Sequence, residues 1–60
     1  MFNPKFDLGE VVKDNITGYT GYITAIIFSI GNDISYQVER DGAGCWFTEV
    51  RLRSHTITIN

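Results

Sequence analysis

The chain has 60 residues, of which 43% are hydrophobic and 13% aromatic, and this composition is typical of one small globular domain. Five Lys and Arg residues stand against seven Asp and Glu residues, and the net charge of −2 argues against a general nucleic-acid-binding protein, which is usually strongly basic. The one cysteine, Cys45, excludes an internal disulfide, and one Cys with one His is too few for a structural zinc site. We therefore expect no metal and no cofactor.

The apolar runs are short. The longest, AIIF, is far below the ~20 residues of a membrane-spanning helix, and the stretch MFNPKFDLGE carries charges where a signal peptide would be apolar. We expect a single domain over residues 1–60, with an N-terminal arm (1–7) and a C-terminal strand extension (54–60). A reducing cytoplasm and no membrane contact are the expected setting.

Val, Ile, Thr, Tyr and Phe dominate the apolar stretches, and glycines separate these stretches about every ten residues, which predicts short β-strands. The turns are expected in DNITG, GND and DGAG. In chain order we expect strands at 9–14, 21–30 and 34–40, a fourth beginning at 45–48, a helical turn within 48–52 and a fifth strand within 51–59.

Five short antiparallel strands with a helical turn before the last one predict an all-β fold, a single SH3-like or Tudor-like barrel. Curling the sheet lets so few residues hide its edges. In the third strand, alternation predicts Tyr36 and Val38 on one face and polar side chains on the other. We expect Trp46 in the core; if it were partly exposed beside Tyr19, it would instead be an interface anchor.

Three stretches carry a family resemblance. FDLGEVVKDNITGYTGYIT, SYQVE and WFTEVRL resemble a pattern of small Tudor-like (SH3-like) proteins of bacteriophages and prophages, and the resemblance spans about residues 6–53. More distantly, V-x-D…G-x-x-G-x-I is similar to the KOW motif of transcription and ribosomal factors. The matched positions are Leu8, Gly9, Val12, Asp14, Ile16, Thr17, Gly18, Gly21, Ile23, Tyr36, Val38, Trp46, Phe47, Glu49 and Leu52.

The resemblance implies a small phage or prophage accessory protein in the bacterial host cytoplasm, with no family reaction to carry over. Such a protein could inhibit a host defence protein by covering a partner or by sequestering a small ligand. The chain departs from the pattern at Val11, in the apolar stretch AIIFSI and in the tail SHTITIN.

Catalysis is not expected. Cys45 and His55 are the one thiol and imidazole, and a nucleophilic pair also needs an orienting group and an oxyanion hole. The glycine stretch GYTG lacks the lysine and the helix of a phosphate-binding loop. We therefore expect a protein that is not an enzyme.

The second predicted strand raises the main functional hypothesis. If Ile23 faces the core, strict alternation places Tyr22, Ile26 and Phe28 on the solvent side, where they would form an exposed apolar row. A strong bend in this strand would reverse the inside and outside positions, and that alternative stays open.

The C-terminal tail adds a second apolar row. Ile57 and Ile59 could meet a partner, add to a sheet edge or exchange in a homodimer, and a bulge or a frayed last strand is the competing interpretation. We expect binding to a host or phage protein and homo-oligomerisation, as a dimer or larger. The candidate interface residues are Tyr19, Tyr22, Ile26, Phe28, Phe47, Ile57 and Ile59.

Two alternatives remain. A KOW-like nucleic-acid-binding protein would use Arg40, Arg51, Arg53 and His55, of which the last three share one face of an extended strand. An oligomer that holds a small ligand between its protomers is the other alternative.

Overall fold

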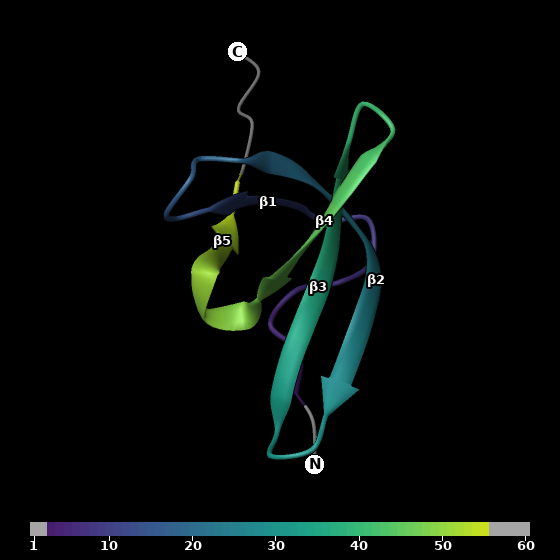
Figure 1. Ribbon diagram of the computed structural model, residues 1–60, viewed down its shortest axis with the longest axis vertical. Coiled ribbons are helices and arrows are strands. Elements are labelled where there is room, and N and C mark those ends of the chain that lie inside the picture. Colours follow the sequence, from purple (N-terminus) through teal and green to yellow (C-terminus); the bar gives the residue numbers. More distant parts are fainter. Residues whose placement is uncertain (1–2, 56–60) are drawn as a thin grey trace.

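Five strands and one short helical turn make up the protein in the computed structural model, which describes residues 3–55 (Figure 1). The expected all-β fold and the helical turn before the last strand are confirmed. Within residues 3–55, no helix is long and apolar enough to cross a membrane. The elements are β1 (Val11–Asp14), β2 (Thr20–Ser29), β3 (Asp33–Arg40), β4 (Ala43–Thr48), the 3-10 turn η1 (Glu49–Arg51) and β5 (Leu52–Ser54).

All five strands belong to one antiparallel sheet with the order β4-β3-β2-β1-β5. The sheet is not closed, because β4 and β5 are its two edges. Figure 1 shows β1 running at a steep angle to β3, so the sheet is strongly curled.

The core lies on this inner face. Tyr36 and Val38 of β3 are fully buried while Ser35, Gln37 and Glu39 are partly exposed, which confirms the alternation expected for this strand. The ring of Phe6, from the segment before β1, meets Tyr36 edge-on at a centroid distance of 5.3 Å. The buried apolar residues are Phe6, Val12, Ile23, Ile34, Tyr36, Val38, Phe47 and Leu52.

A bulge bends the long strand β2. The register shifts between Ile23 and Ala25, so that Thr24 has no direct partner in β3. One extra residue reverses the alternation beyond it. Ile26 therefore packs against the core, and the bend alternative is confirmed.

Gly21 allows β2 and β3 to approach each other at this bend. A Cβ atom at this position would lie 2.4 Å from the carbonyl oxygen of Glu39 and 2.8 Å from Cγ1 of Val38. Any larger residue would force the two strands apart. The second glycine of TGYTGY is therefore required by a close backbone approach.

Candidate functional site: an exposed apolar patch

The outer face of the sheet can be read from β3. Ser35, Gln37 and Glu39 alternate with buried neighbours, so they face outward, and residues opposite them in the ladder share that face. Gln37 lies between Ala25 of β2 and Trp46 of β4. Ile27 and Tyr22 lie opposite Ser35 and Glu39, so both are on this face as well.

Three of these outer side chains are large and apolar. Trp46 is 48% exposed, Tyr22 46% and Ile27 45%. We call these three residues the outer patch. The prediction that Trp46 belongs to the core was wrong, because the β3–β4 register places it opposite outward-facing Gln37. Its neighbour Phe47, opposite Tyr36, takes the inner position instead.

Ala25 and Gln37 also lie on this outer face. They form one cross-strand row with Trp46, in the order Ala25, Gln37, Trp46. The Gln37 side-chain oxygen accepts a hydrogen bond from the Thr24 hydroxyl at 3.2 Å. Gln37 of β3 therefore lies between Trp46 of β4 and the two members of the outer patch in β2.

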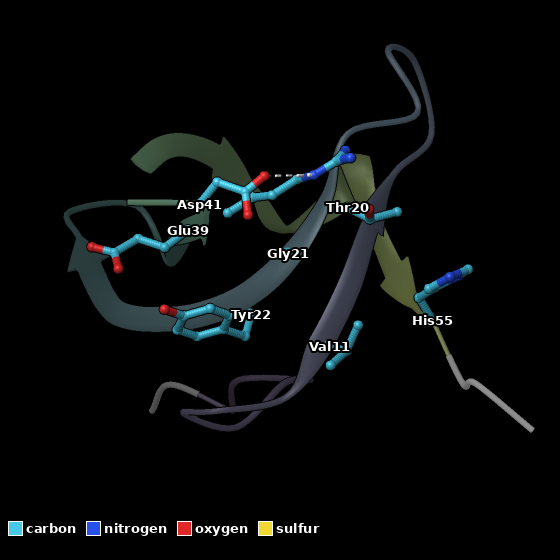
Figure 2. Close-up of a pocket in the computed structure, with 8 residues that line it drawn as sticks. Val11, Thr20, Gly21, Tyr22, Glu39, Asp41 and His55 are labelled. Carbon is cyan, nitrogen blue, oxygen red and sulfur yellow. Dashed lines mark ion pairs between the residues drawn. The ribbon is translucent and has the colours of Figure 1, made fainter. Parts of the chain in front are cut away.

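A surface hollow of about 340 Å³ adjoins the patch at Tyr22. Figure 2 shows Tyr22 between Glu39 on one side and Val11 and His55 on the other. The hollow carries charges of both signs. Its lining residues are Val11, Thr20, Gly21, Tyr22, Glu39, Arg40, Asp41 and His55.

A buried carboxylate at the end of β1 binds the guanidinium of a residue in η1. Asp14 has no exposed surface, and its two oxygens accept hydrogen bonds from Nε and Nη2 of Arg51 at 2.9 and 2.7 Å. The Thr17 backbone N–H and hydroxyl also donate to this carboxylate. The Arg51 hydrogen bonds are the main reason that the pKa of Asp14 is far below its ordinary value, although burial opposes this shift.

This ion pair ties the turn after β1 to η1. The Arg51 guanidinium also lies over the Phe47 ring, 5.2 Å from its centroid. Arg51 therefore serves the fold, with two of its five N–H donors bonded to the Asp14 carboxylate and its side chain 34% exposed. The nucleic-acid alternative placed Arg51 in an extended strand with Arg53 and His55. In the structure, Arg51 lies in the 3-10 turn η1.

A second polar cluster holds the N-terminal segment. The Tyr36 hydroxyl donates to the carboxylate of Glu49, and the Lys5 backbone N–H donates to both side chains. Burial, with the Glu49 hydrogen bond next in weight, raises the pKa of Tyr36 to about 12. The same hydrogen bond lowers the pKa of Glu49. All three groups are used in holding the segment before β1.

Of the remaining residues of the nucleic-acid alternative, Arg40 and His55 line the same hollow, and Arg53 is not among its lining residues. Arg40 is exposed near the β3–β4 turn, where its Nε lies 3.7 Å from a carboxylate oxygen of Asp41. Arg53 of β5 lies opposite Lys13 of β1, a cationic neighbour that the sequence did not single out. His55 follows β5 and lines the hollow.

The other predicted interface residues fall in several places. Tyr19 and Ile26 pack against the core, Phe47 is 8% exposed and belongs to it, and Phe28 is 47% exposed near the end of β2. Ile57 and Ile59 lie outside the described residues. The sequence analysis missed Ile27.

The residues considered for catalysis lie on different edges of the sheet. Cys45 is a free, exposed thiol in edge strand β4, whereas His55 follows the opposite edge strand, β5. Across residues 3–55, no three His, Cys, Asp or Glu side chains are grouped so that they could hold a metal ion.

Comparisons with protein-family models, with curated proteins and with solved structures gave no match to this chain.

Proposed function

We propose that the protein is a small SH3-like or Tudor-like barrel that catalyses no reaction and binds a protein partner through the outer patch. One observation carries the proposal: Trp46, Tyr22 and Ile27 are each nearly half exposed on one face of the sheet. The barrel is supported by the strand order β4-β3-β2-β1-β5, the bend in β2 and the 3-10 turn before β5.

The chain has only one Trp, and its exposed side chain adds little to the core. Trp and Tyr are the residues most enriched at binding hot spots, since each gives a large contact area with few rotatable bonds. This surface suits a protein with apolar side chains of its own.

The resemblance to phage and prophage proteins suggests the source of the partner. A host or phage protein in the bacterial cytoplasm would be bound and covered, and a host defence protein is one such target. Occupying a surface requires no catalytic group, which agrees with a site built from apolar side chains and hydrogen-bonded amides.

The test is capture from bacterial lysate by the immobilised protein and two matched variants. Ile27→Lys places a charge in the outer patch, and Val50→Lys places the same charge on η1 at a side chain that is 87% exposed. We expect the wild type and Val50→Lys to retain the same protein, and Ile27→Lys to lose it. Retention should survive nuclease and added salt, because apolar contacts are not screened.

Two results would contradict the proposal. Equal capture by Ile27→Lys would place the binding surface elsewhere. Capture that nuclease removes, that salt weakens steeply and that Arg53→Glu abolishes would favour the nucleic-acid alternative, centred on Arg53 and Lys13.

A further inference from the structure

Edge strand β4 is open for pairing. Among residues 3–55 it has a neighbour on one side only, β3, and five of its six residues are exposed. Its sequence AGCWFT contains no charge and no proline. Charged residues, prolines and bulges usually protect a sheet edge from pairing. Strand β4 has neither a charged residue nor a proline.

The direction of its backbone groups follows from the β3–β4 turn. Asp41 and Gly42 have φ angles of 53° and 81°, as in a two-residue turn of type I′. Such a turn is closed by a hydrogen-bonded pair, here Arg40 and Ala43, and these pairs alternate along the ladder. The N–H and C=O groups of Gly44 and Trp46 and the N–H of Thr48 therefore point away from β3, toward the open edge, while the Thr48 carbonyl, at the N-cap of η1, accepts the first hydrogen bond of that turn.

From this edge we infer that β4 pairs antiparallel with β4 of a second copy, about a two-fold axis at Trp46. Trp46 then lies opposite Trp46 of the second copy, and Gly44 lies opposite its Thr48. This register pairs all three outward-pointing residues of each strand. A shift by two residues would leave Gly44 or Thr48 of each copy without a strand partner.

The charges favour a second copy at this edge over the other edge. Pairing of β4 with itself brings no like charges together. Pairing of two β5 edges would bring Arg53 of both copies together beside Lys13 of each β1. Opposite each other at the axis, the two Trp46 rings can pack as a cross-strand aromatic pair.

This inference rests on the proposed function, because Trp46 belongs to the outer patch. The dimer would join the two outer patches into one continuous apolar surface across a shared sheet. The partner would then be bound by both copies.

The test is the solution mass by light scattering over a wide range of protein concentrations. We expect two chains per particle at high concentration, little affected by salt. Trp46→Lys puts two like charges opposite each other at the axis, and we expect only single chains. Ile27→Lys is the matched control: it lies on the same face, two strands from the edge, and should remain dimeric while losing the partner protein.

Cross-linking through Cys45 checks the register without altering the fold. The two Cys45 residues would be diagonal neighbours about 7–8 Å apart. A short bis-maleimide should therefore join two wild-type chains, and it should not join chains of Cys45→Ser. This measurement decides the question even if Trp46→Lys fails to fold.

Three results would overturn the inference. Single chains at every concentration would exclude the dimer. A dimer that persists in Trp46→Lys without a Cys45 cross-link would place the contact elsewhere. A dimer that is lost when residues 56–60 are deleted would show that the tail occupies the edge. A wild-type dimer that retains no protein from the lysate, or an Ile27→Lys dimer that retains as much as the wild type, would instead refute only the proposed function.

Discussion

Trp46 and Phe47 are neighbours in β4, yet they take part in different tasks. Phe47 is buried and packs against Tyr19 at a centroid distance of 5.7 Å, while Arg51 lies over its ring. Trp46 points the other way and is 48% exposed. The inner face of the sheet is completed by contacts within the chain, whereas the outer face offers its largest side chain to solvent. The difference separates residues that make the fold from residues that are available for binding.

Truncation of Phe47 should have the largest effect. Phe47→Ala removes a buried ring, and a change of this kind costs about 3–5 kcal/mol of unfolding free energy. For a domain of 60 residues, this is a large fraction of the total stability. Urea unfolding followed by circular dichroism would measure the loss. If Phe47→Ala lowered the free energy of unfolding no more than Trp46→Ala does, that result would contradict the assignment of the two faces.

Breaking the buried ion pair should come next. Asp14→Asn leaves Arg51 without its counter-charge, and we expect the melting temperature to fall on the order of 10 °C. Asp41→Asn is the control, because the Arg40–Asp41 pair is exposed and 3.7 Å long. A similar small change in both variants would show that the buried pair has no special weight.

The same carboxylate sets the acid limit of stability. The folded-state pKa of Asp14 is lowered, so its contribution is fully present above the unfolded-state pKa of about 3.9. That contribution is lost as the pH falls from there through the folded-state pKa. Asp14→Asn should therefore flatten the acid side of the stability profile, and an unchanged profile would contradict the role of this pair.

A methyl group at Gly21 should be moderately costly. Gly21→Ala directs a Cβ atom at the Glu39 carbonyl, and overpacking of this kind costs about 1–3 kcal/mol. At Gly44 the nearest atom to an added Cβ is the flexible amide end of Gln37, at 3.1 Å. Gly44→Ala should therefore be milder in the same urea titration. The reverse order would show that β2 and β3 do not need this close approach.

Tyr36 should give a smaller effect at alkaline pH. Its folded-state pKa is about 12, above the unfolded value of about 10. The stability that it contributes is therefore complete below pH 10 and is lost as the pH rises through 12. Tyr36→Phe should remove this dependence. Tyrosinate absorbance of the folded protein would follow the same group, and full ionisation of all tyrosines near pH 10 would contradict the burial.

Local alternation and turn chemistry made three features predictable: the positions of the strands along the chain, the positions of the turns and the inner face of β3. The orientation of Trp46 was within reach as well. A two-residue turn at Asp41–Gly42 sets the β3–β4 register, and that register places position 46 opposite outward-facing Gln37. Size and aromaticity alone pointed to the core and gave the wrong answer.

Other features depend on contacts between distant segments. The bulge at Thr24 reverses the faces of β2, so Ile27 became an outer residue in place of Ile26. Asp14 and Arg51 are far apart in the chain, and the type of either residue does not predict which residue it pairs with. The spacing of the residues in the sequence therefore could not distinguish the role of Arg51 from that of Arg53.

Quenching of Trp46 fluorescence by a neutral solute tests the central claim most directly, because Trp46 is the one tryptophan of the chain. We expect strong quenching in dilute protein, where the outer patch faces water. Quenching should weaken as the protein is concentrated, since the β4 edges and the outer patches then meet. Weak quenching in dilute protein would contradict the exposed patch, and strong quenching that does not change with concentration would contradict its use in association.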